Sequence, residues 1–241
     1  MNTLPVLASP PRAWTDDTAW DRKLARDADA VGEHLPPGLR ALHELVVSRA
    51  RSIDARALIL SGSTARGCRT EVSDLDYHLI GSEIDTSDLS LELDIHTLSE
   101  KELHSEIVLG DDFIQWSLRF GCVVFDDGTA RRGLRLIDES RPWPDVERKR
   151  DHAVKSLALA ERFVATGDED GALEQVRTAL SLAARAKLLQ VGVFPLCRAE
   201  MPLQLDAVGH PKAARALTEA IHGAPTLEAL SEAVHIGRCL S

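Results

Sequence analysis

Residues 57–80, ALILSGSTARGCRTEVSDLDYHLI, decide the fold of the first half of the chain. The stretch opens with four apolar residues, Ala57–Leu60, a pattern typical of a short buried strand. A turn at residues 61–63 (SGS) and a polar loop follow, and polar and apolar residues then alternate along residues 74–80. Because strand side chains alternate between two faces, the stretch predicts a strand, a glycine turn, a loop and a second strand.

The second predicted strand carries two aspartates on one face. Asp74, Asp76 and His78 share that face, while the apolar residues between them share the other. Two neighbouring carboxylates repel each other, so this pair is costly to hold without a cation. The pattern therefore indicates a functional site close to the glycine turn.

A third strand is predicted at residues 89–97 (LSLELDIHT), where leucine and isoleucine alternate with polar residues. Its polar face carries Glu92, Asp94 and His96. Only 18 residues separate Asp76 from Asp94, which predicts a tight connection between the two strands without an intervening helix. The histidines beside the acids are either polar substrate contacts or structural hydrogen-bonding residues.

Apolar residues that recur at three- and four-residue spacing predict helices around these strands. Ser99 and Glu102 have the spacing of a capping box, and Asp111 can cap a further helix. The other predicted elements of this half are helices at residues 16–35, 39–50, 99–108, 111–120 and 129–139 and a strand at residues 122–125.

The run RPWP at residues 141–144 marks a change from mixed elements to helices alone. We expect an α+β fold class, with a small mixed β-sheet domain and flanking helices at residues 1–143, followed by an all-α helical bundle domain at residues 144–241. The helices of the second domain are predicted at residues 146–166, 168–191, 196–207, 211–221 and 226–237.

The composition is that of a globular protein with an acidic first half. The chain has 241 residues, 44% of them hydrophobic, and a formal net charge of −10. Residues 1–147 hold 16 basic and 27 acidic side chains and the rest is close to neutral, which disfavours a nucleic-acid partner. No apolar run approaches the roughly 20 residues that cross a bilayer, and the start lacks a signal-peptide pattern. With four scattered cysteines, these features predict a cytoplasmic protein without a membrane partner.

The motifs GSTARG at residues 62–67 and SDLD at residues 73–76, followed by Asp94 on the next strand, occur in the order of a known signature. They resemble the DNA polymerase β-like nucleotidyltransferase superfamily, in which Gly-Ser, a turn and Asp-x-Asp precede a third acid. With its helical second half, the chain is similar to minimal and small-molecule nucleotidyltransferases with a C-terminal helical domain. Glycine-serine turns and acid pairs are common singly, so an ordinary strand-loop-strand unit with surface acids is the alternative.

The resemblance implies a metal site made by three catalytic aspartates. Asp74, Asp76 and Asp94 would hold two Mg²⁺ ions, since aspartates supply the hard oxygen ligands that magnesium prefers. Asp94 is expected to be the third metal ligand, the general base for the acceptor hydroxyl, or both. Glu92 lies two residues away on the same face and is the rival for this role.

The resemblance also implies a site for the nucleoside triphosphate. Gly62 lets the backbone approach the phosphates, and Ser63 adds a hydroxyl. Arg66 either reaches a phosphate or lies on the surface. Lys187, in the helical half, either closes over the triphosphate or extends its stem toward solvent.

Together these features predict a magnesium-dependent nucleotidyltransferase that moves a nucleoside monophosphate, with ATP as the expected donor, to an acceptor hydroxyl. The acidity of the chain favours a cationic small molecule as acceptor, such as an aminoglycoside. The alternatives are a toxin-linked enzyme that modifies a protein or a tRNA, and a catalytically silent nucleotide-binding protein. The acceptor and the oligomeric state are left open, a homodimer included.

Overall fold

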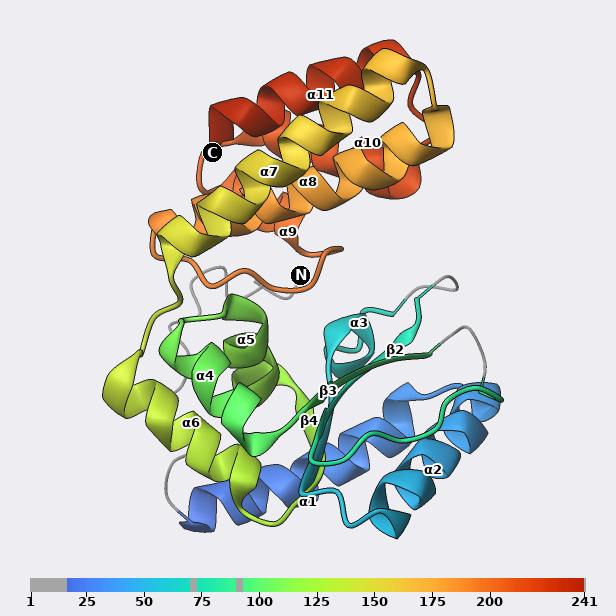
Figure 1. Ribbon diagram of the computed structural model, residues 1–241, viewed down its shortest axis with the longest axis vertical. Helices are drawn as coiled ribbons and strands as arrows, with labels where there is room; N and C mark the ends of the chain where they lie inside the picture. Colours follow the sequence, from blue (N-terminus) through green and yellow to red (C-terminus); the bar gives the residue numbers. More distant parts are fainter. Residues whose placement is uncertain (1–16, 70–72, 90–92, 241) are drawn as a thin grey trace. The chain divides into compact units, whose positions relative to one another are not determined.

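The computed structural model describes residues 17–69, 73–89 and 93–240 (Figure 1). Glu92, the rival for the role of third acid, lies outside these described residues. The chain forms two compact units that divide between Pro144 and Asp145, next to the predicted boundary. Each unit has a hydrophobic core of its own.

The first unit is built on a four-stranded sheet with the strand order β3-β2-β1-β4. β1 (Ala57–Leu60) pairs antiparallel with β2 (Leu75–Ile80) and with β4 (Cys122–Asp126), while β2 pairs parallel with β3 (Leu93–Leu98). This mixed sheet with its surrounding helices confirms the predicted α+β class. The described part of the β2–β3 connection, residues 81–89, contains no helix, as the short spacing predicts.

Six helices of the first unit accompany the sheet in the described residues (Figure 1). They are α1 (Asp17–His34), α2 (Pro37–Ser52), α3 (Gly62–Ala65), α4 (Glu100–Val108), α5 (Asp112–Phe120) and α6 (Thr129–Ser140). The predicted capping box begins α4, because the Ser99 side chain accepts from the Glu102 backbone and the Glu102 carboxylate accepts from the Ser99 backbone. Asp111 caps α5 as predicted.

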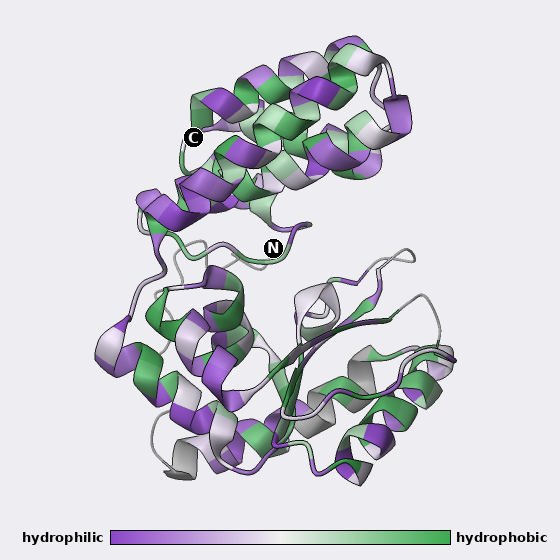
Figure 2. Ribbon diagram, viewed as in Figure 1, coloured by the Kyte–Doolittle hydropathy of each residue, from purple (hydrophilic) through white to green (hydrophobic). Residues whose placement is uncertain are grey.

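Helices cover both faces of the sheet. On one face Ile59, Ile80 and Val123 are buried together with apolar residues of α4, α5 and α6. On the other face Leu58 and Leu79 are buried with residues of α2 and of the C-terminal part of α1. Figure 2 shows the hydrophobic residues, in green, concentrated along the strands between these helices. The sheet therefore lies between two apolar cores, one on each face.

α1 closes the outer edge of β4. Lys23 and Asp27, one helical turn apart, form a buried ion pair. The Lys23 ammonium also donates to the Gly121 carbonyl at 2.7 Å, and the Asp27 carboxylate accepts from the Val123 backbone N–H at 2.9 Å. Because each charge has hydrogen-bond partners, this pair is tolerated in the core and fixes α1 against β4.

The second unit consists of helices in its described residues. They are α7 (Val146–Thr166), α8 (Glu169–Gln190), α9 (Met201–Ala207), α10 (Pro211–His222) and α11 (Leu227–Leu240). Small residues allow these helices to approach closely. At Gly237 of α11, an added Cβ atom would lie 2.6 Å from a methyl group of Leu157 on α7. This close packing agrees with the predicted helical bundle.

The predicted helix at residues 196–207 is wrong in its first part, because α9 begins only at Met201. The buried Gln204 side chain accepts from the Leu196 backbone N–H at 2.9 Å and donates to the Phe194 carbonyl at 2.9 Å. These bonds satisfy the Leu196 N–H and the Phe194 carbonyl without a helix.

The predicted strand at residues 89–97 is wrong at its start. Leu89 lies in a turn, in which its backbone N–H donates to the Thr86 carbonyl at 3.0 Å. β3 is described from Leu93 onward. The apolar alternation of the sequence runs across this turn, so spacing alone could not locate the boundary.

Candidate functional site

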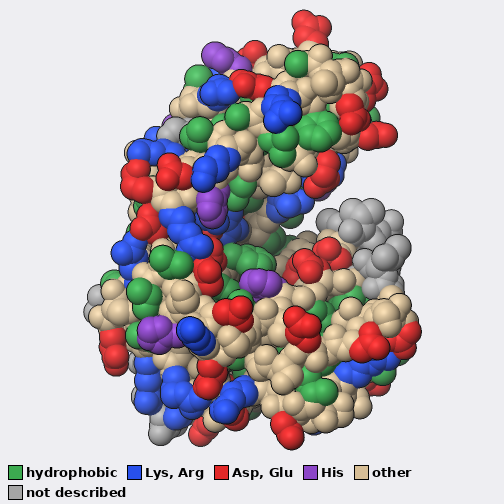
Figure 3. All heavy atoms as spheres, viewed as in Figure 1, with side chains coloured by type: hydrophobic (Ala, Val, Ile, Leu, Met, Phe, Trp, Pro, Cys, Tyr) green, Lys and Arg blue, Asp and Glu red, His purple; other side chains and the backbone are tan. Residues whose placement is uncertain are grey.

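The predicted acids come together where β2 and β3 pair in parallel. In this register Asp76 lies opposite Asp94, and His78 lies opposite His96. Partners in a parallel ladder project from the same face, so these four side chains share one face of the sheet. Asp94 and His96 are exposed and Asp76 is partly exposed. Figure 3 shows acidic side chains, in red, and a histidine, in purple, exposed on the visible face of the first unit.

Gly62, in the turn after β1, lies directly against the Asp76 carboxylate. Its φ angle is +64°, which places it in the left-handed region, and an added Cβ atom would lie 1.9 Å from Asp76 Oδ2. Any other residue would be strained in its backbone and would displace the carboxylate. The glycine of the motif is therefore required both for the turn and for the position of Asp76.

Two buried hydroxyl residues fasten this turn to β2. The backbone N–H and the hydroxyl of Ser61 both donate to the Asp76 carbonyl, at 2.8 and 3.2 Å. The Thr64 hydroxyl donates to the Asp74 carbonyl at 3.3 Å. Neither Ser61 nor Thr64 is among the predicted site residues; the sequence signal for them is a hydroxyl residue on each side of the Gly-Ser pair. They hold the backbone of both aspartates in register with the turn.

Asp74 precedes β2 and is exposed. Among the described residues, the carboxylates of Asp74 and Asp94 form no hydrogen bond or ion pair. Acids that lack a basic partner in the protein concentrate negative potential at one place on the surface. This edge of the sheet is thus suited to attract a cation.

Asp74, Asp76 and Asp94 fit a hard divalent cation by their chemistry. Carboxylate oxygens are the ligands that Mg²⁺ prefers, and Asp76 and Asp94 are neighbours across the ladder. Their oxygens and those of Asp74 do not all lie within 4.8 Å of one another. A cation would therefore have to draw these exposed side chains together by rotation.

His78 lies next to the acids but is buried, with 3% of its surface exposed. Its ring centroid is 5.2 Å from that of His96 and 4.8 Å from that of Phe113, and its Nδ1 lies 3.5 Å from the Ser61 hydroxyl. Burial, and secondly the charge of His96, lower the pKa of His78 to about 3. His78 is therefore a neutral ring packed behind the acids, whereas His96 is open to solvent.

The residues predicted for the phosphate site are divided between the two units. Ser63 is partly buried in α3, and its carbonyl accepts from the Cys68 backbone N–H at 3.0 Å. Arg66 follows directly as the C-cap of α3 and is partly buried. Lys187 belongs to α8 of the second unit, where its ammonium donates to Gln190 Oε1 at 3.1 Å. Their roles at a phosphate remain predictions.

The chain is similar to a solved nucleotidyltransferase-like protein from Exiguobacterium sibiricum, with 16% sequence identity, coverage of 83% of this chain and 73% of that chain, and a TM-score of 0.39. No family model matches the sequence, and no curated protein matches it. A TM-score this low supports no statement about residues or activity.

None of the helices in the described part of the chain is both long enough and apolar enough to cross a membrane.

Proposed function

We propose that the chain is a magnesium-dependent nucleotidyltransferase that transfers a nucleoside monophosphate, with ATP as the donor, to an acceptor hydroxyl. The observation that carries the proposal is the parallel register of Asp76 with Asp94, together with the contact of Gly62 with the Asp76 carboxylate. This arrangement joins the three parts of the sequence motif, which lie on separate segments of the chain. Antiparallel pairing of β1 with β2 brings Gly62 to Asp76, and parallel pairing of β2 with β3 adds Asp94 at the same position.

The aspartates have separate roles in the proposed reaction. Asp74 and Asp76 hold the divalent cation, and Asp94 completes the ligand set or accepts a proton. Bound Mg²⁺ supplies positive charge that stabilises the phosphate oxygens and the leaving pyrophosphate. Because Asp94 is exposed beside Asp76, an acceptor can reach it from solvent.

Bond changes follow from these roles. The acceptor hydroxyl oxygen attacks the α-phosphorus, the bond from that phosphorus to the bridging oxygen of pyrophosphate breaks, and the hydroxyl proton passes to Asp94. Gly62 admits the triphosphate close to the backbone, while Ser63 and Arg66 contribute donors for its oxygens. Lys187 is proposed as a further phosphate contact from the helical unit.

The acceptor is proposed to be a cationic small molecule of the aminoglycoside type. Support comes from the net charge of −10 and from the exposed acids beside the site. Negative potential raises the local concentration of a cationic substrate and disfavours a polyanion such as tRNA.

The test is incubation of the purified chain with Mg²⁺ and each α-labelled NTP, with aminoglycosides, total tRNA or lysate protein offered separately. We expect label in the aminoglycoside pool only, with pyrophosphate released. Label in tRNA or protein would replace the small-molecule acceptor by a macromolecular one. Magnesium-dependent ATP binding without pyrophosphate release in any pool would indicate a nucleotide-binding protein and contradict the proposal.

A variant pair shows whether the observed transfer depends on this site. Asp76→Asn removes the carboxylate that lies against Gly62, while Asp88→Asn removes an exposed carboxylate that pairs with Arg49 beyond the strand. Label should disappear in Asp76→Asn and remain in Asp88→Asn. Equal transfer by both variants would show that the chemistry lies elsewhere.

A further inference from the structure

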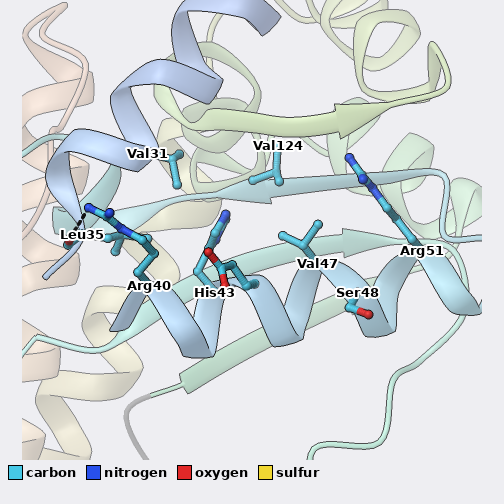
Figure 4. Close-up of a pocket in the computed structure, with 9 residues that line it drawn as sticks. Val31, Leu35, Arg40, His43, Val47, Ser48, Arg51 and Val124 are labelled. Atoms are coloured by element: carbon cyan, nitrogen blue, oxygen red, sulfur yellow. Dashed lines mark hydrogen bonds between the residues drawn. The ribbon is translucent and has the colours of Figure 1, made fainter. Parts of the chain in front are cut away.

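A groove of about 560 Å³ lies on the face of the sheet opposite the acids, between α1, α2 and β4 (Figure 4). Its apolar walls come from Val31 of α1, Leu35 directly after α1, Val47 of α2 and Val124 of β4. A volume in this range is typical of sites that bind small molecules, which span about 300–1,000 Å³. The groove belongs wholly to the first unit.

One stripe of α2 lines the groove. Its members recur at three- and four-residue spacing, so they lie on one helix face, next to the face that packs on the sheet. Figure 4 shows Arg40 and Arg51 at opposite ends of this stripe, with His43 and Val47 between them pointing into the groove. The stripe comprises Arg40, His43, Glu44, Val47, Ser48 and Arg51.

The groove has a cationic end at Arg51. The Arg51 guanidinium lies over the Phe125 ring, 5.6 Å from its centroid, and forms no ion pair among the described residues. At the other end Arg40 donates to the Leu35 carbonyl at 3.4 Å. The lining contains two arginines and one carboxylate, Glu44, which is exposed. The formal charge of the lining residues is therefore positive. Arg51 is an exposed residue, and a guanidinium beside apolar walls is suited to a carboxylate attached to an apolar body.

His43 adds a directed polar group to the middle of the groove. Its Nδ1 lies 2.6 Å from the Tyr77 hydroxyl. Burial lowers the pKa of His43 and raises that of Tyr77, so both groups are neutral near pH 7. When the Tyr77 hydroxyl donates to Nδ1, the proton of the neutral ring is on Nε2, which is then a donor.

We propose that this groove is a second ligand site of the protein, which binds an amphipathic carboxylate with its apolar body against Val47 and Val124 and its carboxylate at Arg51. The site is separate from the proposed nucleotide site, because it uses the opposite face of the sheet. The ligand would contact His43, whose hydrogen-bond partner Tyr77 lies between Asp76 and His78 on β2.

Calorimetric titration with decanoate tests the proposal, with two matched ligands. Acetate carries the same charge without the chain, and decyltrimethylammonium carries the same chain with the opposite charge. We expect saturable one-to-one binding of decanoate and at least about tenfold weaker binding of the other two, since both the apolar and the ionic contact contribute.

Variants on α2 locate the binding. Arg51→Gln should weaken decanoate binding about tenfold, and Val47→Phe should do so by filling the groove. Arg49→Gln is the matched control, because it removes the same charge from the same helix, where Arg49 pairs with Asp88 outside the groove. It should leave the affinity unchanged. Thermal unfolding of each variant checks that its fold is intact.

Tyr77 provides a direct readout, since it is the one tyrosine of the chain. Labelling with ¹³C-tyrosine therefore gives a single Cζ resonance, which should shift with decanoate at the affinity found by calorimetry. Absence of decanoate binding, equal binding of decyltrimethylammonium, or equal weakening by Arg49→Gln and Arg51→Gln would overturn the proposal. Binding that leaves the tyrosine resonance unmoved would place the ligand elsewhere and overturn it as well.

Discussion

The two faces of β2 differ in what their side chains can do. Leu75, Tyr77 and Leu79 are each exposed by 1% or less and belong to the core that α2 covers. On the other face Asp76 is partly exposed and the next residue on that face, His78, is buried. One face of β2 is thus buried along its length, whereas the other is accessible at Asp76 and buried at His78 and Ile80.

This difference shows how a rigid position is given to groups that are unfavourable in the core. Apolar burial on one face stabilises the strand, at about 25 cal/mol per Å² of apolar surface removed from water. The strand then fixes the direction of the Cα–Cβ bond of Asp76 on the opposite face, although Asp76 itself is partly exposed. Substitutions on the two faces should consequently separate activity from stability.

The largest effect is expected for Asp76→Asn. Loss of a metal-binding carboxylate should lower the transfer rate by about a thousandfold or more, which corresponds to about 4 kcal/mol of transition-state stabilisation. The midpoint of thermal unfolding should change little, because the residue is partly exposed and the new side chain has the same shape. Transfer of label from ATP, measured beside circular dichroism, checks both parts. A variant with a much lower unfolding midpoint and an unchanged transfer rate below that midpoint would reverse the assignment of the two faces.

Leu79→Ala should show the opposite behaviour. Removing a fully buried leucine side chain should lower the free energy of unfolding by about 2–5 kcal/mol. Below the unfolding transition, the rate per folded molecule should be close to that of the parent. Urea denaturation measures the stability, and Leu45→Ala on α2 is the control, since Leu45 is 41% exposed and should cost far less.

Gly62→Ala should lower both stability and transfer activity, because Gly62 lies against the Asp76 carboxylate. The left-handed backbone conformation alone should cost about 1–2 kcal/mol, and the added methyl group must push Asp76 aside, so transfer should fall as well. Gly38→Ala is the matched control. An added Cβ at Gly38 meets nothing within 4 Å, and in α2 it should leave stability equal or slightly higher. Equal behaviour of the two variants in urea denaturation would contradict the role given to Gly62.

A smaller effect is expected for Tyr77→Phe on the apolar face. The change removes the 2.6 Å hydrogen bond to His43, and we expect a loss of about 1–2 kcal/mol in the free energy of unfolding. Transfer activity should persist, since the hydroxyl points away from the acids. Urea denaturation and the label assay on the same preparation check this, and an activity loss as large as that of Asp76→Asn would show that the faces are not independent.

The smallest effect concerns pH and His43. Burial lowers the pKa of His43 in the folded chain, so the unfolded chain binds the proton more readily. This residue therefore makes stability fall as pH drops below the unfolded pKa of about 6.5. His43→Gln should show a shallower decline of the urea midpoint between about pH 7 and pH 5 than the parent does. A steeper decline would give the wrong sign and disprove the neutral His43.

Much of the first unit was predictable because strand and helix periods follow from covalent geometry. Alternation along residues 74–80 identified which side chains share a face, and the Ser99–Glu102 spacing located the start of α4. Register could not be predicted in the same way. That Asp76 faces Asp94, and not a residue two positions away, depends on how β2 and β3 slide against each other.

Contacts between distant residues account for what the sequence left undetermined. The hydroxyl bonds of Ser61 and Thr64 exist only because the turn approaches β2, and the bond between His43 and Tyr77 joins residues 34 positions apart. The late start of α9 has a similar cause, since the Gln204 side chain replaces helical hydrogen bonds. Hydrogen bonds between distant residues produce no periodic pattern in the sequence.

The attachment of α1 along β4 also bears on solubility. β4 is an outer strand of the sheet, and an uncovered outer strand is a template for pairing with another chain. The Asp27 carboxylate occupies the Val123 N–H, and the Lys23 ammonium occupies the Gly121 carbonyl beside it. A chain shortened to begin after α1 would leave these backbone groups without their partners. It would also lack Trp20 and so expose the core residues that are buried together with it. By covering β4, α1 prevents this strand from pairing with another copy of the chain. Forms of the protein that lack α1 should therefore aggregate.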